Sequence, residues 1–216
     1  APLSVNAIRN CIDGTINETE ITHLITVSCT GMSAPGLDLQ VMELVGLRSN
    51  IYRSSVNFMG CYAAIHALKI ADIICKNDTS AKVMIVCTEL CTLHFQRESS
   101  INSITSSLLF ADGSAAALVT HDSFEKKGLH IDGFYSEVIS KGKNDMSWEL
   151  SSSGFLMTLS GYVPELIEED FGSLVNKAAA HAGTSKEQIS HWCIHPGGKR
   201  ILDAIGHSLR FENNEL

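Results

Sequence analysis

The chain has 216 residues, of which 44% are hydrophobic and 19% charged, and its formal net charge is −8 at pH 7. This composition is typical of a globular protein and excludes disordered, collagen-like and coiled-coil chains. Nucleic acids and anionic membranes attract positively charged surfaces, so the acidic balance argues against both as main partners. No apolar run approaches the ~20 residues that span a bilayer.

The seven cysteines lie within apolar segments and lack the spacing of a disulfide framework. They indicate mostly buried free thiols in a reducing compartment, and we therefore expect the protein to be cytoplasmic. The first residues lack the charged and apolar regions of a signal peptide. Both ends of the chain read as interrupted, and we expect a fragment of a longer protein.

Helix and strand patterns alternate through the first part of the chain. The segment 21–28, which is apolar and rich in β-branched residues, and the apolar run in 82–87 predict buried strands, and 51–56 predicts a further strand between them. Three segments with helical patterns predict helices: 1–12, 36–45 and 61–75. The segment 61–75 has only a narrow polar stripe, so we expect this helix to be nearly surrounded by protein.

The segment after the third strand is more polar. Residues 99–107 are rich in serine and predict a loop. Residues 108–110 and 115–120 predict two strands flanking the turn Ala111-Asp112-Gly113. A further strand is predicted at 129–138.

A polar loop at Lys141–Asp145 is the best internal boundary and divides the chain into regions 1–140 and 141–216. In the second region, Pro164 begins a helix that reaches His181. A short strand at 191–195, a tight turn at 196–198 and a helix at 199–209 follow it. The alternation of helices and strands predicts an α/β layered fold.

The most informative segment for chemistry is SVNFMGCYAAIHAL, in which a strand leads through Gly60 to Cys61 at the start of a helix. A thiol there faces unpaired backbone N–H groups and the positive end of the helix dipole, which lower its pKa. Gly60 allows a sharp turn. The alternative is a cysteine that only fills space at a helix start.

A second strand–turn–helix pattern occurs in HWCIHPGGKRILDAI, where His195 precedes the Pro-Gly-Gly turn. A histidine there is positioned to act as the base for a thiol from the other region. The alternative is a core histidine bonded to backbone.

Metal binding is a third interpretation of these residues. The first candidate set is His191, Cys193 and His195, which alternate along one predicted strand face. The second set is Cys87, Cys91 and His94. Neither has a CxxC pair or a supporting carboxylate, so we expect no metal.

Five motifs occur in an order and spacing that resemble one family: HLITVSCTGMSAPG, SVNFMGCYAA, KVMIVCTEL, LLFADGSAAALV and CIHPGGKRILD. With these motifs the chain resembles the type III polyketide synthases, the chalcone and stilbene synthase family, in a bacterial-type version. The resemblance runs from about Ile21 to Leu209. It implies a partial thiolase-like αβαβα fold. Region 1–140 would be the end of the N-terminal half and 141–216 the start of the C-terminal half.

The resemblance also implies roles for individual residues. Cys61 matches the family nucleophile and His195 the catalytic histidine. The third catalytic residue of the family is an asparagine in a GNMSS-type motif, expected just beyond Leu216. Asn213 and Asn214 do not lie in such a motif.

Other positions match substrate contacts of the family. Phe110 matches a gatekeeping phenylalanine, and Met157 aligns with a second gatekeeper that is usually phenylalanine. The remaining matches are pocket-lining Cys29, Cys91 and Trp148, and Gly197, Gly198 and Arg200 along the CoA arm.

The implied reaction is the decarboxylative condensation of malonyl-CoA onto a Cys61-bound acyl starter delivered as an acyl-CoA. It needs no redox cofactor and no metal, and the family implies a homodimer. Two alternatives remain open. One is a 3-ketoacyl synthase that condenses once, which product length would distinguish. The other is a truncated, non-catalytic core that folds and dimerises.

Overall fold

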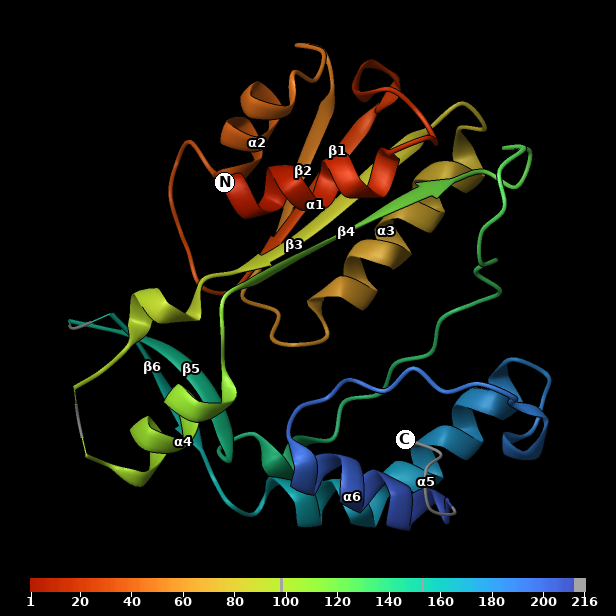
Figure 1. The fold of residues 1–216 in the computed structure, drawn as a ribbon. Coiled ribbons are helices and arrows are strands. Elements are labelled where there is room, and N and C mark those ends of the chain that lie inside the picture. Colours follow the sequence, from red (N-terminus) through yellow and green to blue (C-terminus); the bar gives the residue numbers. More distant parts are fainter. Residues whose placement is uncertain (98, 153, 212–216) are drawn as a thin grey trace. The chain divides into compact units, whose positions relative to one another are not determined.

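The computed structural model describes residues 1–97, 99–152 and 154–211, with the side chain of Asn102 not described. The chain forms two compact units (Figure 1). The first unit comprises Ala1–His94 and Ala111–Ile131. The second comprises Phe95–Phe110 and Asp132–Leu216.

The first unit is built on a four-stranded sheet with the strand order β2-β1-β3-β4. Its strands are β1 (His23–Ser28), β2 (Tyr52–Asn57), β3 (Lys82–Glu89) and β4 (Gly113–Thr120). Strands β2 and β3 each pair parallel with β1, and β4 pairs antiparallel with β3. The carboxyl ends of β2, β1 and β3 therefore meet at one edge of the sheet.

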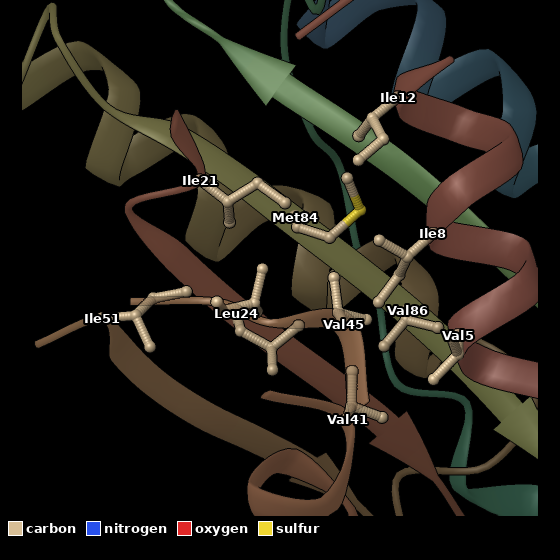
Figure 2. Packing of buried hydrophobic residues seen from close by; sticks show 11 residues of the cluster. Val5, Ile8, Ile12, Ile21, Leu24, Val41, Val45, Ile51, Met84 and Val86 are labelled. Carbon is tan, nitrogen blue, oxygen red and sulfur yellow. The ribbon is translucent and has the colours of Figure 1, made fainter. Parts of the chain in front are cut away.

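Helices cover both faces of this sheet. The helices are α1 (Pro2–Ile12), α2 (Leu37–Val45) and α3 (Ala63–Asn77). Figure 2 shows Ile8 of α1 lying over Met84 and Val86 of β3, in a cluster to which α2 also contributes. On the opposite face, α3 packs against the alternate residues Val83 and Ile85 of the same strand. Both faces of β3 are buried, and this explains why the strand reads as a continuous apolar run.

Helix α3 departs from the sequence prediction in two ways. It begins at Ala63, two residues after Cys61. Only one face is buried, through small residues that lie four apart: Ala63, Ala67, Ala71 and Cys75. On the other side Ile65 and Ile73 are 51% and 53% exposed, so the first unit by itself does not surround the helix.

The second unit contains a hairpin and helices. The hairpin pairs β5 (Met146–Ser151) with β6 (Gly154–Leu159), and the helices are α4 (Ile101–Leu109), α5 (Val163–His181) and α6 (Lys199–Leu209). Helix α4 packs against β6, and α5 packs against α6. The backbone N–H of Gly172 donates to the hydroxyl of Ser208, a close helix approach that a larger residue at 172 would obstruct.

Helix α4 replaces the loop predicted at 99–107 and the strand predicted at 108–110. The Ser100 hydroxyl accepts the Ser103 N–H and so caps the helix. Ile101, Ile104 and Leu108 recur at helical spacing, a pattern that the serine content concealed.

Two further predicted strands, 129–138 and 191–195, form no ladder in the described part of the chain. Leu129 and Val138 are 100% and 89% exposed, so no neighbouring element packs on them. Trp192 and Ile194 pack on the core formed by α5 and α6, and their alternation reflects burial against helices.

Within the described residues, no helix combines the length and apolarity needed to cross a membrane.

Candidate functional site

Cys61 lies in a tight turn between β2 and α3. Phe58 and Gly60 both have positive φ angles, +54° and +77°, and Phe58 is an uncommon residue in that region. The Gly60 carbonyl accepts the Ala63 N–H at 3.1 Å, which leads the chain into α3. Cys61 is exposed. A bulky residue held in this conformation is typical of functional sites, where surrounding structure maintains the strain.

The ionisation of Cys61 differs from the sequence prediction. The pKa of its thiol is raised, chiefly by the partial burial of the sulfur and then by repulsion from Cys29 and Glu89. The expected lowering of the pKa by the helix N-terminus does not prevail, because Cys61 precedes α3 and burial and the Glu89 carboxylate both disfavour the thiolate. The surroundings of Cys61 within the first unit therefore disfavour the thiolate.

Two other predicted site residues lie at the same edge of the sheet. Cys29 follows β1 directly, and Cys91 begins the short 3-10 helix η2 (Cys91–His94) after β3. The pKa of Cys91 is raised by partial burial, then by Glu89, Asp112 and Cys61. The structure thus brings Cys29, Cys61 and Cys91 within electrostatic reach of one another.

Glu89, the last residue of β3, connects these loops. Its carboxylate accepts the Cys29 N–H at 2.9 and 3.1 Å and the Thr30 hydroxyl at 2.7 Å. The same Thr30 hydroxyl accepts the Leu90 N–H at 2.8 Å, and the Thr30 carbonyl accepts His94 Nε2 at 2.6 Å. Sequence reasoning did not single out Glu89, although it stands directly after a buried strand in KVMIVCTEL.

In the second unit, His195 lies in an exposed loop before α6. Its carbonyl accepts the Gly197 N–H at 2.9 Å. A Cβ at Gly197 would lie 3.6 Å from His195 Nε2, so the imidazole lies over this glycine. Gly198 has a φ of +134°, which strongly favours glycine, and it caps α6.

Arg200 is held by a carboxylate. Its Nη2 atom lies 2.9 Å from Glu165 Oε1, so the pair joins the first turns of α6 and α5. Both side chains are exposed. The Arg200 side chain is 67% exposed, and its Nη1 atom would lie 3.9 Å from a Cβ at Gly161.

The two predicted gatekeepers both belong to the second unit. Phe110 is half-buried and follows α4, which packs against β6. Met157 is half-buried on β6 opposite Trp148 of β5. Met157 and Trp148 lie on one face of the hairpin, and all six residues of that face are apolar: Met146, Trp148, Leu150, Phe155, Met157 and Leu159.

The metal alternatives have no geometric support. No three His, Cys, Asp or Glu side chains gather as metal ligands within residues 1–97, 99–152 and 154–211. Neither His191, Cys193 and His195 nor the set around Cys87 forms such a group.

Comparison with known proteins places these residues in one family. Residues 2–123 match the model of the N-terminal domain of chalcone and stilbene synthases. Residues 132–216 match the model of the C-terminal domain of the same enzymes. The chain belongs to the chalcone and stilbene synthase family. Cys61 falls in the N-terminal chalcone synthase match, and His195, Met157 and Arg200 fall in the C-terminal match.

Relatives of this chalcone synthase-like chain include polyketide synthases from several lineages. Probable polyketide synthase 1 of Dictyostelium discoideum is 31% identical over an alignment of 197 residues, and the match covers 88% of this chain and 6% of that protein.

Three solved structures have the same fold. The C-terminal type III polyketide synthase domain of Steely1, a type I/III hybrid from Dictyostelium, is 27% identical with a TM-score of 0.88. PKS-I from the brown alga Ectocarpus siliculosus is 26% identical with a TM-score of 0.92. The bacterial 1,3,6,8-tetrahydroxynaphthalene synthase of Streptomyces coelicolor A3(2) is 27% identical with a TM-score of 0.87.

This similarity confirms the predicted thiolase-like α/β fold. The matches cover 100%, 99% and 96% of this chain and 61%, 57% and 60% of those chains, in the same order. The chain therefore spans about three-fifths of each solved type III synthase. Cys61 belongs to the first unit and His195 to the second, so their pairing stays a prediction. So does the division at residues 140 and 141.

Proposed function

We propose that this chain carries the acyl-transfer centre of a type III polyketide synthase. In this proposal Cys61 accepts an acyl group from an acyl-CoA starter, and malonyl-CoA supplies the extending unit. The observation that supports it most directly is the strained turn that presents the exposed Cys61 where the parallel strands end. Ligands of α/β sheets bind at this edge.

The first step is thioester exchange. His195 takes the Cys61 proton, and the thiolate sulfur attacks the acyl carbonyl of the starter. The new C–S bond forms as the bond to coenzyme A breaks, and the CoA thiolate leaves with the proton from His195. The surroundings of Cys61 in the first unit favour the neutral thiol. A nearby imidazolium would therefore compensate the charge of Glu89 and stabilise the thiolate.

The second step extends the chain. The bond between the malonyl carbon and its carboxylate breaks, CO₂ leaves, and the electron pair forms the enolate of acetyl-CoA. The enolate carbon attacks the Cys61 thioester, and the cleaved C–S bond restores the thiolate. Hydrogen-bond donors at the enolate oxygen stabilise this step, and loss of one such donor typically costs about 10²–10³ in rate. We assign one donor to His195.

The remaining assignments concern the substrate. Phe110 and Met157 would shape the passage to the acyl pocket, and Cys29 and Cys91 would line that pocket. Gly197, Gly198 and Arg200 would lie along the CoA arm, where the exposed guanidinium is available to an anion. We expect a homodimer, as the family implies. The seven free thiols agree with a reducing, cytoplasmic compartment.

Intact-protein mass spectrometry after mixing with hexanoyl-CoA tests the proposal. The wild-type chain should gain one hexanoyl group, and Cys61→Ser should gain none. Cys193→Ser is the matched control, because Cys193 is also an exposed free thiol. An adduct that persists in Cys61→Ser would contradict the assignment of the nucleophile.

If wild type gains no adduct, iodoacetamide labelling below neutral pH separates two causes. A Cys61 that reacts there is activated and lacks its proper starter, whereas an unreactive Cys61 indicates a chain that is inert by itself. Adding malonyl-CoA to the acylated protein then distinguishes iterative extension from a single condensation by product length.

A further inference from the structure

The edge of the sheet that holds Cys61 also holds one carboxylate whose role the proposed reaction leaves open. Glu89 lies at the end of β3 beside the loops that follow β1 and β3, where it accepts hydrogen bonds from the Cys29 N–H and the Thr30 hydroxyl. Thr30 is 6% exposed, so this contact is largely screened from water. The Glu89 side chain therefore connects neighbouring parallel strands at the point where they end.

We propose that Glu89 is a positioning residue of the Cys61 site, whose carboxylate fixes the Cys29–Thr30 segment and places a negative charge beside the nucleophile. The inference rests on the proposed function of Cys61. It assigns Glu89 no contact with substrate.

The positioning part follows from the donor groups. A backbone N–H and a hydroxyl that both face one carboxylate form charge-assisted hydrogen bonds, which are stronger than neutral ones. The Leu90 N–H completes the arrangement through Thr30. Removing the carboxylate would leave the Cys29 N–H and the nearly buried Thr30 hydroxyl without this acceptor. The segment beside Cys61 would then open more readily.

The charge part follows from the surroundings. The neighbouring elements bring several ionisable groups to this edge of the sheet: Cys29 after β1, Cys87 on β3, Cys91 and His94 of η2, and Asp112 before β4. Two carboxylates act on these thiols: Glu89 itself and Asp112. The Asp112 carboxylate accepts hydrogen bonds from the Thr92 N–H and hydroxyl at 2.9 and 2.7 Å, and its charge contributes to the raised pKa of Cys91. Glu89 is the carboxylate whose charge contributes to the raised pKa of Cys61.

The consequence is a nucleophile whose reactivity depends on its partner. A negative charge nearby disfavours a second negative charge on the sulfur. The Cys61 thiolate would therefore gain stability from a cation placed beside it, such as an imidazolium. This arrangement would keep the thiol unreactive toward oxidants and alkylating agents until the site is assembled.

Alkylation of Cys61 by iodoacetamide between pH 6 and pH 10, followed by peptide mass spectrometry, tests the charge. In Glu89→Gln, the pH at which Cys61 becomes reactive should fall, and the rate at pH 7 should rise about 3- to 10-fold, as expected from removing one charge several ångström away. Glu43→Gln changes the net charge equally at an exposed position on α2 and should match wild type. High salt should reduce the difference.

Hydrogen exchange in the Cys29–Thr30 segment tests the positioning. Glu89→Ala removes the acceptor and should accelerate exchange of the Cys29 amide, whereas Glu89→Gln keeps an acceptor oxygen and should accelerate it less. If Glu89→Ala fails to fold, the Gln variant carries both measurements. Glu89→Gln with wild-type alkylation and wild-type exchange would overturn the proposal. Neither readout requires acyl transfer, so a failure here is distinct from a failure of the proposed function.

Discussion

The hydroxyl oxygens of Ser4 on α1 and Thr88 on β3 lie 2.9 Å apart, and the two residues are only 0% and 3% exposed. Thr88 also lies 2.8 Å from the Ser114 hydroxyl, which donates to the Cys87 carbonyl. This buried chain of hydroxyls ties α1 to β3 and β4 one residue before Glu89. It helps to hold the sheet edge on which the candidate site is built.

Breaking this chain should destabilise the first unit in a non-additive way. Thr88→Val leaves the Ser4 hydroxyl buried without that partner and should lower the free energy of unfolding by about 1–3 kcal/mol. Ser4→Ala should lower it by about 1 kcal/mol, because Thr88 keeps Ser114. The double variant should lose less than the sum of the two.

Urea unfolding followed by far-UV circular dichroism measures these differences. Tryptophan fluorescence would not report on this unit, because Trp148 and Trp192 both belong to the other one. Strictly additive effects would show that the two hydroxyls do not interact energetically.

The turn before Cys61 should be sensitive to conformation and insensitive to side-chain volume. A Cβ at Gly60 would meet only ring atoms of Tyr62 at 3.8 and 3.9 Å, which is ordinary contact, but φ is +77°. Gly60→Ala should therefore destabilise by about 1–2 kcal/mol through the backbone alone. Gly31→Ala is the control, because Gly31 lacks a positive φ and has open space around it. Equal unfolding midpoints for the two variants would refute this view of the turn.

The apolar face of the β5–β6 hairpin predicts a starter preference. Met157 shares that face with Trp148, whereas Leu156 lies on the other face of the hairpin, where it pairs with Glu149. If Met157 lines the acyl passage, Met157→Phe should narrow it and reduce Cys61 acylation by hexanoyl-CoA about 10-fold relative to acetyl-CoA. Leu156→Phe should leave the ratio unchanged. Both rates come from the intact-mass assay, and an effect in Leu156→Phe alone would place the passage on the other face.

Stability should fall at alkaline pH because of Cys75 on α3. Burial raises the pKa of this thiol from 9.0 to about 11, with Asp72 and Asp78 adding to the shift. Between these values the unfolded chain loses the proton while the folded chain keeps it, so unfolding becomes easier as pH rises. The full loss amounts to about 2–3 kcal/mol. Urea midpoints between pH 8 and pH 11 should fall less steeply in Cys75→Ala than in wild type. Parallel curves would contradict the assignment.

The two central strands of the first unit, β1 and β3, were predictable because they are buried on both faces. Segments such as 21–28 and 82–87 therefore form apolar runs that can be recognised in the sequence without knowing which strands they pair with. The hairpin of the second unit was not predicted, although MSWELS alternates apolar and polar residues without exception. Helix α4 was missed because serine composition outweighed its apolar spacing.

The candidate site was predictable at Cys61, where a glycine and a strand-to-helix transition mark the position. Its ionisation was not, because the pKa of Cys61 depends first on the burial of its sulfur and then on groups distant in sequence, such as Glu89, 28 positions later in the chain. Hydrogen bonds between loop ends, such as those from Cys29 and Thr30, leave no periodic signal in the sequence. Long-range electrostatics of this kind become visible only when the strands are placed side by side.

The excursion of Phe95–Phe110 into the second unit affects the order in which the protein can fold during synthesis. Helix α4 leaves the ribosome well before β6, the strand on which it packs. Isolated helices shorter than about 12–15 residues are marginal in water, and α4 has nine. During translation this segment remains a nascent, unsupported stretch while its neighbours 1–94 and 111–131 can already assemble. The first unit must therefore close around a loop that becomes ordered only when the hairpin emerges.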